Sequence, residues 1–203
     1  MDNFFSQDTI SLAKNLLGKL LLIKTEGKLI GGYIVETEAY LGIKDKACHS
    51  YMAKRNKKNE AMYKKCGTIY IYTMHTHKML NIVSCEENNP QAVLIRAIEP
   101  VYEIEIMEKN RGKKGILISN GPGKLTKAMG ITDELNMKFM QENELFIDFE
   151  NSKKPLKIDS SARIGIPDKG IWTKRKLRFF VYGNKYVSNM RCKELKTNTW
   201  LEH

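Results

Sequence analysis

The chain has 203 residues, of which 34 are Lys or Arg and 23 are Asp or Glu, so its formal net charge is +11. A composition of 42% hydrophobic and 28% charged residues is typical of a globular protein and excludes a largely disordered chain. No apolar run approaches the roughly 18 residues that a spanning helix requires, so the sequence predicts no membrane segment.

The N-terminal residues 1–8 (MDNFFSQD) lack the basic stretch and the apolar core of a secretory signal, so we expect a cytoplasmic protein. The four cysteines are widely spaced and form no CxxC pair, and we expect free thiols. Residues 201–203 (LEH) resemble the start of an expression-tag scar. Because no Pro-, Gly- or Ser-rich linker divides the rest, the sequence predicts a single domain over residues 1–200.

The predicted elements begin with a helix over residues 8–17, where apolar side chains recur at helical spacing and Gly18 follows as a C-terminal cap. Strands over 20–23 and 29–37 flank a Glu26-Gly27 turn and predict a hairpin. Further elements are predicted as strands at 68–72, 80–83, 92–98, 145–149, 163–166 and 177–182, and as helices at about 101–110 and 122–129. Strands outnumber helices and do not alternate with them regularly. The sequence therefore predicts an α+β domain with a curved, mostly antiparallel sheet flanked by helices.

Positive charge is concentrated in three segments. Residues 44–65 hold eight basic and two acidic residues, residues 109–127 hold six basic residues and no acid, and residues 151–193 hold twelve basic and two acidic residues. The remainder of the chain is acidic, so the sequence indicates a basic face. The usual partner of such a face is nucleic acid, followed by an anionic membrane surface, and the alternative is lysine that only serves solubility.

Two carboxylates and an aromatic ring share one face of a predicted strand. Glu36, Glu38 and Tyr40 alternate with other residues and therefore point to the same side. One carboxylate could act as a general base and the tyrosine as a stacking surface, whereas the alternative is an exposed strand end with solvated charges. Arg96 is the one charge in the apolar run 92–98, and a carboxylate such as Glu38 would satisfy it, in a functional or a purely structural pair.

Several further polar residues have a functional and an ordinary interpretation. The ring of His49 could donate one directed hydrogen bond to a substrate, or it could be a satisfied polar residue. Tyr70 and Tyr72 share a strand face, where core packing is the common role of tyrosine. His75 and His77 suggest zinc together with Cys48 and His49, but no second pair of ligands has the characteristic spacing.

Residues 120–124 read Asn-Gly-Pro-Gly-Lys and precede a predicted helix. The segment lacks the full Walker A pattern, so the sequence does not support nucleotide hydrolysis. A contact from backbone amides and Lys124 to a DNA phosphate requires less and fits better.

Ordered blocks over nearly the whole chain, from about residue 12 to residue 190, resemble the alkyladenine (3-methyladenine) DNA glycosylases of the mammalian type, which also occur in bacteria. The blocks are IVETEAYLG at 34–42, ACHS at 47–50, GTIYIY at 67–72, LNIV at 80–83, VLIRAIEP at 93–100, NGPGKL at 120–125, ARIGI at 162–166 and LRF at 177–179. The resemblance implies a monofunctional DNA glycosylase of base excision repair. Such an enzyme hydrolyses the N-glycosidic bond of alkylated or deaminated purines (the 3-methyladenine, hypoxanthine and ethenoadenine class) after base flipping.

The resemblance also implies roles for individual residues. Glu38 would be the general base, and Arg96 and the backbone carbonyl of Ile164 would hold the attacking water. The substrate-binding residues would be Tyr40 and Tyr72, which sandwich the flipped base, His49, which bonds its edge, and Asn81, which crowds the exocyclic amine of guanine. The resemblance implies no metal and no cofactor. The partner would be double-stranded DNA containing damaged purines, bound by a monomer in the bacterial cytosol at the nucleoid.

The chain departs from the family pattern in two places. The family usually has a bulky wedge, commonly tyrosine, shortly after the second pocket tyrosine, and here Met74 or His75 would have to fill the gap left by the flipped nucleotide. Residues 56–59 read Asn-Lys-Lys-Asn in place of the more usual Thr-Pro-Arg-Asn. Two alternatives remain: a non-catalytic nucleic-acid-binding domain that uses the same basic face, and a zinc hydrolase built on His49, His75 and His77.

Overall fold

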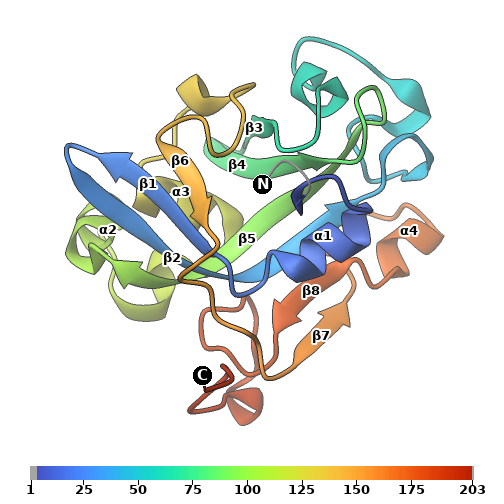
Figure 1. The fold of residues 1–203 in the computed structure, drawn as a ribbon. Coiled ribbons are helices and arrows are strands. Elements are labelled where there is room, and N and C mark those ends of the chain that lie inside the picture. Colours follow the sequence, from blue (N-terminus) through green and yellow to red (C-terminus); the bar gives the residue numbers. More distant parts are fainter. Residues whose placement is uncertain (1–3, 203) are drawn as a thin grey trace.

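Two long antiparallel strands, β2 (Lys28–Tyr40) and β5 (Gln91–Tyr102), form the middle of the computed structural model, which describes residues 4–202 (Figure 1). Residues 1–3 and His203, the last residue of the predicted tag scar, lie outside the described part. The other strands are β1 (Leu20–Thr25), β3 (Ile69–Met74), β4 (His77–Ser84), β6 (Leu145–Asp148), β7 (Ile158–Ser161) and β8 (Arg178–Val181). Their order is β3-β4-β5-β2-β1-β6, with β8 pairing both β2 and β7, and all these pairs are antiparallel.

The helices lie on both sides of this sheet. The helix α1 (Thr9–Asn15) begins at Asp8, whose side chain accepts hydrogen bonds from two backbone N–H groups of the first turn. Thr37 of β2 donates from Oγ1 to the carbonyl of Ala13 at 2.8 Å, so this side chain points to the α1 side. Figure 1 shows α1 in front of the sheet and α2 (Ile104–Arg111) and α3 (Pro122–Met129) behind it. The neighbours of Thr37 on β2 therefore point to the α3 side.

Two hairpins have tight two-residue turns. Glu26 and Gly27 between β1 and β2 both have a positive φ, of 50° and 79°, which is the geometry that a twisted two-residue hairpin requires. His75 and Thr76 between β3 and β4 also have a positive φ, of 46° and 71°. Since neither residue is glycine or asparagine, this second turn is strained, and it carries exposed side chains at its tip.

The middle of β2 has strands on both of its edges. Glu36, Thr37 and Glu38 pair with β8 on one side, while β5 pairs on the other side with a shift of register around Glu36. Such a bulge re-aims side chains and is common beside active sites. The interpretation of Glu36 and Glu38 as an exposed strand end is therefore wrong, because both side chains are fully buried within the sheet.

The α+β class and the antiparallel sheet, which curls into a half-barrel, are confirmed, as are the predicted helices near 8–17, 101–110 and 122–129 and the first hairpin. The strand predicted at 163–166 is wrong. Arg163 turns its side chain toward Asp45, and the Ile164 N–H bonds to a side chain, so neither residue joins a strand ladder. The strand of this region is β7, and the short helix α4 (Ile171–Lys174) follows it. In the described residues, no helix is long and apolar enough to cross a membrane.

Candidate active site

A pocket of about 190 Å³ opens on the α3 side of the sheet, beside the end of β2. Its walls come from segments far apart in the sequence: the end of β2, the loop at 47–49, the strands β3, β4 and β5, the start of α3 and the loop at 164–167. Of the predicted site residues, the structure places the following in this lining: Tyr40, His49, Tyr72, Met74, Asn81, Arg96 and Ile164. The structure thus brings these seven residues together around one pocket.

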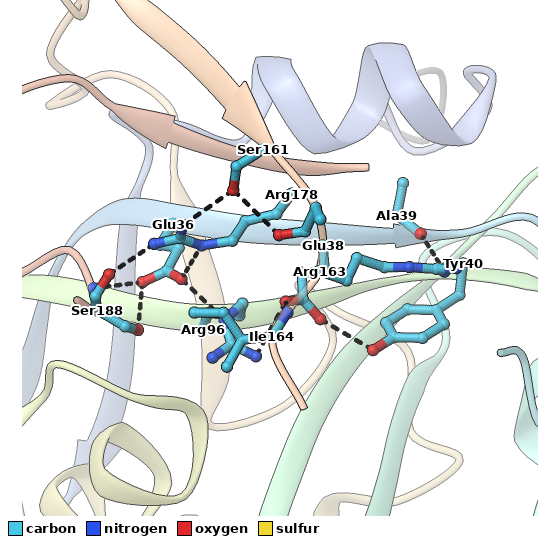
Figure 2. Close-up of polar contacts among 11 residues, drawn as sticks. Glu36, Glu38, Ala39, Tyr40, Arg96, Ser161, Arg163, Ile164, Arg178 and Ser188 are labelled. Carbon is cyan, nitrogen blue, oxygen red and sulfur yellow. Dashed lines mark hydrogen bonds and ion pairs between the residues drawn. The ribbon is translucent and has the colours of Figure 1, made fainter. Parts of the chain in front are cut away.

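Glu36 and Glu38 share one arginine directly beneath the pocket (Figure 2). Arg96 donates from Nε to Glu36 Oε1 at 2.8 Å, and its Nη1 lies 3.1 Å from Glu38 Oε1. Figure 2 shows the guanidinium of Arg96 between the two carboxylates. The predicted pairing of Arg96 with Glu38 is confirmed, and the same guanidinium also holds Glu36.

The carboxylate of Glu38 has three donors around it. Besides Arg96, the backbone N–H of Ile164 donates to Oε1 at 2.8 Å, and the hydroxyl of Tyr40 donates to Oε2 at 2.9 Å. An ionised carboxylate can accept about four hydrogen bonds, so one acceptor position on Oε2 is left. Glu38 itself is fully buried beneath Tyr40, Arg96 and Ile164, which line the pocket.

The two carboxylates differ in acidity. Burial raises the pKa of Glu38 above its usual value, although Arg96 and the N–H of Ile164 oppose this effect. Burial acts on Glu36 in the same way, but Arg96, Arg178 and the two hydrogen bonds from Ser188 together outweigh it and hold the pKa of Glu36 below its usual value. Of the two, Glu38 is therefore the better proton acceptor.

Glu36 accepts four hydrogen bonds, one more than the number of donors around Glu38. Arg178 donates from Nε to Glu36 Oε1 at 2.6 Å, and Ser188 donates to Oε2 from its backbone N–H at 2.7 Å and from its hydroxyl at 2.6 Å. Arg178 is itself held by the carbonyl of Ser188 and the hydroxyl of Ser161. Sequence reasoning missed Arg178, although a charge in the apolar run 177–182 is the same signal that marked Arg96.

The aromatic residues form a connected group on the pocket wall. His49 Nδ1 lies 2.8 Å from the Tyr70 hydroxyl, and the His49 ring meets the Tyr72 ring edge-on at 4.6 Å between centroids. Burial lowers the pKa of His49, which favours a neutral ring, and burial raises the pKa of Tyr72 to about 12. Tyr70 is buried in a small apolar cluster, whereas Tyr72 is only partly buried against it. The other buried members of this cluster are Cys48, Ala61, Met62, Tyr63, Val83 and Ala92. The interpretation as a packing residue therefore fits Tyr70 better than Tyr72.

A second buried ion pair was not predicted. Arg163 donates from Nη1 to Asp45 Oδ2 at 2.6 Å and from Nη2 to Asp45 Oδ1 at 2.9 Å, and both side chains are completely buried. The guanidinium carbon of Arg163 lies 4.6 Å from the centre of the Tyr40 ring. No pattern around Asp45 marks it in the sequence, because its partner is more than a hundred residues away.

Asn81 has a fixed orientation in the pocket wall. Its Nδ2 donates to the carbonyls of Tyr70 and Met79 at 3.0 and 3.1 Å. Both donor hydrogens of the amide are used inside the protein, which leaves Oδ1 as the group that Asn81 can present to a ligand.

The predicted DNA-contacting residues lie around the pocket mouth or near it. Met74 ends β3 and lines the pocket with 44% of its surface exposed, whereas His75 lies at the tip of the strained turn. Lys124 does not line the pocket; its Nζ donates to Asn120 Oδ1 at 2.7 Å. Pro122, at the first turn of the same helix, is the residue of α3 that reaches the pocket.

Two grooves adjoin the pocket and share His49 with it. One, of about 350 Å³, is lined by Lys46, Lys54 and Lys169, without an acidic residue among its described lining. The other, of about 560 Å³, has Lys57, Lys58 and the β3 end in its wall, together with one acidic residue, Asp133. The basic segment 44–65 thus supplies lysines to both grooves.

His75 lies in the turn between β3 and β4 and His77 begins β4, and both side chains are exposed. Among residues 4–202, no three His, Cys, Asp or Glu side chains are grouped so that they could hold a metal ion. The cysteines are free thiols: Cys48 is buried beside the pocket, and Cys66, Cys85 and Cys192 lie elsewhere.

Comparison with known proteins identifies the class of this molecule. A family model described as methylpurine-DNA glycosylase (MPG) matches residues 3–185. The chain therefore belongs to the methylpurine-DNA glycosylase family, and it is a DNA glycosylase, a hydrolase that acts on N-glycosyl bonds in DNA.

Individual relatives are similar in sequence to this chain along almost their whole length. The chain is 49% identical over 194 residues to a Staphylococcus saprophyticus protein named "Putative 3-methyladenine DNA glycosylase", covering 96% of both chains. It is 46% identical over 200 residues to a Staphylococcus aureus (strain JH9) protein of the same name, covering 98% of this chain and 99% of the relative. These findings confirm the resemblance and the enzyme class predicted from it.

Proposed function

We propose that the protein is a monofunctional glycosylase that removes alkylated and deaminated purines, of the 3-methyladenine, hypoxanthine and ethenoadenine class, from double-stranded DNA. Glu38 is the general base of this reaction. The observation that carries the proposal is the environment of Glu38: a buried carboxylate beneath an aromatic-walled pocket, with three fixed donors and one acceptor position that no described residue fills. The enzyme would act in base excision repair in the bacterial cytosol, on the nucleoid.

The substrate base must leave the DNA helix to reach this pocket, at a cost of a few kcal/mol. Tyr40 and Tyr72 offer aromatic faces on which the flipped base would stack, each worth roughly 1–3 kcal/mol. His49 would donate a hydrogen bond to the base edge from the ring nitrogen that does not face Tyr70. Asn81 would disfavour guanine, because its fixed amide crowds the position of the exocyclic amine.

Bond cleavage then follows from the chemistry of the carboxylate. Water in the open position of Oε2 would give a proton to Glu38 as it attacks the anomeric carbon of the sugar. Arg96 and the backbone carbonyl of Ile164 would hold that water in place. As the purine departs, the sugar develops positive charge, which the ionised carboxylate stabilises. The free base and an abasic site are the products, and the DNA backbone stays intact.

The absence of strand cleavage is expected from the pocket lining. A glycosylase that also cuts the backbone uses an amine as nucleophile. Among the described residues that line the pocket, none is a lysine. The single basic face and the small size of the chain support a monomer as the active form.

Residues around the pocket would bind the DNA on either side of the flipped nucleotide. The phosphates of the damaged strand would lie in the two basic grooves, and Lys124 with the start of α3 would contact a further phosphate. We propose Met74, rather than His75, as the side chain that fills the gap in the helix. Met74 is apolar and lies at the pocket mouth, and apolar wedges are typical of proteins that unstack DNA.

The test uses labelled duplexes that carry one hypoxanthine or one ethenoadenine, and methylated DNA as the source of 3-methyladenine. Wild-type protein and Glu38→Gln are incubated with each substrate, and hot alkali then cleaves the strand at abasic sites. We expect cleavage by the wild type and a loss of at least about 100-fold in the variant, which still binds DNA. Glu105→Gln on the exposed face of α2 is the matched control and should retain full activity.

Two outcomes would contradict the proposal. Base release by Glu38→Gln at the wild-type rate would remove Glu38 from the role of general base. DNA binding by the wild type without release of any of the three bases would show that this chain does not act on these lesions.

A further inference from the structure

The pair of Asp45 and Arg163 lies directly behind the aromatic wall of the pocket. Among the described residues that line the pocket, Tyr40 is present and Arg163 is not. Because the guanidinium carbon lies 4.6 Å from the centre of the Tyr40 ring, it covers the ring face that points away from the pocket. The Tyr40 ring is thus supported from behind by a cation, and a flipped base would stack on its free face.

The same pair joins three segments of the site. Arg163 donates to the carbonyl of Ala39 at 3.0 Å, next to Tyr40. Asp45 accepts hydrogen bonds from the backbone N–H of Leu41 at 3.1 Å and of Ala47 at 3.0 Å, in the loop that leads to His49. Arg163 also directly precedes Ile164, whose N–H donates to Glu38. The pair therefore holds the aromatic wall, the loop of His49 and one donor to the base in fixed relative positions.

Charge is the second property of this arrangement. A purine methylated on a ring nitrogen carries a positive charge in DNA, and a cation is attracted to the free face of a tyrosine ring. An uncompensated guanidinium behind the same ring would repel that cation, and water is excluded from the space around this pair. Asp45 contacts Arg163 through both carboxylate oxygens, so the pair as a whole is neutral.

We propose that Asp45 and Arg163 are positioning residues that set how well the pocket accepts positively charged purines. Arg163 holds the Tyr40 ring from behind, and Asp45 cancels the charge that Arg163 brings there. This inference rests on the proposed function, in which Tyr40 stacks on the damaged base. Neutral lesions such as hypoxanthine need the ring in position but do not need the cancellation of charge.

The test compares one cationic and one neutral lesion under single-turnover conditions: release of 3-methyladenine from methylated duplexes and release of hypoxanthine from duplexes that carry it. Asp45→Asn keeps the shape of the side chain and removes its charge. We expect the half-saturating enzyme concentration for 3-methyladenine to rise by on the order of tenfold relative to that for hypoxanthine. Asp148→Asn, at the end of β6, removes one negative charge outside the pocket lining and should leave this ratio unchanged.

Arg163→Gln gives the decisive comparison, because it leaves the negative charge of Asp45 behind the ring. The ratio should then move in the opposite direction, in favour of 3-methyladenine, even if both lesions are released more slowly. The double variant Asp45→Asn with Arg163→Gln restores neutrality and should return the ratio to the wild-type value. If Asp45→Asn alone does not fold, Arg163→Gln and the double variant still test the inference.

A shift in the same direction for both single variants, or equal loss for both lesions, overturns the inference, because a purely structural role predicts such results. Release of neither lesion by the wild type is a different result and contradicts the proposed function itself. If the wild type releases both lesions and no variant changes the ratio between them, only the proposed role of Asp45 and Arg163 is contradicted.

Discussion

The hydroxyl of Tyr40 donates a hydrogen bond of 2.9 Å to Oε2 of Glu38, two residues earlier on the same strand. This contact places the proposed stacking surface and the proposed base on one stretch of backbone, with β5 and β8 on its two sides. A base that stacks on Tyr40 is thus positioned relative to the carboxylate by the alternation of a single strand.

The rate of base release should depend on the ionisation of Glu38. Only the carboxylate form can accept a proton from water, so activity is lost as the pH falls through the pKa of this group. Since burial raises that pKa, the loss should begin at a higher pH than for an ordinary glutamate. Single-turnover rates measured from about pH 4 to pH 9, a range that spans ordinary carboxyl and histidine values, check this expectation.

Tyr40→Phe serves as the control for the titrating group. The variant keeps the ring but removes a donor that lowers the pKa of Glu38, so the acid limb should move to higher pH. At a pH on that limb we expect a rate about tenfold below the wild type, the size typical of a hydrogen bond to a charged group. An acid limb that stays in place would mean that the group observed is not Glu38.

Glu36 should matter more for stability than Glu38. Glu36→Gln leaves Arg96 and Arg178 without their shared carboxylate, and breaking a buried pair typically costs about 3–5 kcal/mol. In the wild type this contribution is present at neutral pH. It is lost as the pH falls from the ordinary glutamate value through the lowered pKa of Glu36. Urea unfolding of Glu36→Gln and of Glu38→Gln measures the difference in their free energies of unfolding.

Glu38→Gln should reduce the free energy of unfolding much less, because Arg96 keeps Glu36 as its partner. Burial also makes the charged form of Glu38 costly, as its raised pKa indicates. Equal destabilisation by the two substitutions would contradict the assignment of Glu36 as the anchor of Arg96.

The groove lined by Lys46, Lys54 and Lys169 should contribute to DNA affinity without discriminating between DNA sequences or between damaged and undamaged DNA. Replacing Lys46, Lys54 and Lys169 by Gln should weaken binding of damaged and undamaged duplexes alike. The slope of log K against log salt should fall by about 0.9 for each DNA phosphate that the variant no longer neutralises. Fluorescence anisotropy at several salt concentrations gives both quantities.

The matched control replaces lysines of a groove that shares no described residue with the pocket, namely Lys14, Lys153 and Lys154. This triple variant has the same change in net charge. If it lowers the salt slope as much as the first, the DNA does not lie in the groove beside the pocket.

Met74→Ala should slow base release from duplex DNA by about tenfold or more, because the unstacked helix loses the side chain that fills its gap. Release from a single strand, where no stack has to be opened, should change little. His75→Asn is the control, since asparagine tolerates the left-handed backbone of this turn. A larger effect of His75→Asn on the duplex reaction would assign the gap-filling role to His75.

The elements of the site that follow strand alternation could be predicted from the sequence. Glu36, Glu38 and Tyr40 were placed on one face by their spacing, and Arg96 was marked as a charge inside an apolar strand that needs a carboxylate. Both inferences use only the period of a strand and the cost of burying a charge. The structure agrees with each of them.

The remaining contacts depend on tertiary structure that carries no local pattern. The N–H of Ile164 donates to Glu38 because the chain leaves the sheet after β7, whereas the apolar run at 163–166 predicted a strand. Asp45 meets Arg163, and Ser188 meets Glu36, across more than a hundred residues of chain. A backbone amide or a lone serine has no signature that periodicity could reveal.

Ser188 lies three residues beyond the stretch that the methylpurine-DNA glycosylase model matches, which ends at residue 185. Its amide and hydroxyl nevertheless provide two of the four bonds to Glu36, and Glu36 orients Arg96 beneath the pocket. A protein cut at the edge of the recognised family segment would therefore retain every described residue that lines the pocket. It would lose part of the support that orients them, so the catalytic unit is longer than the segment by which it is recognised.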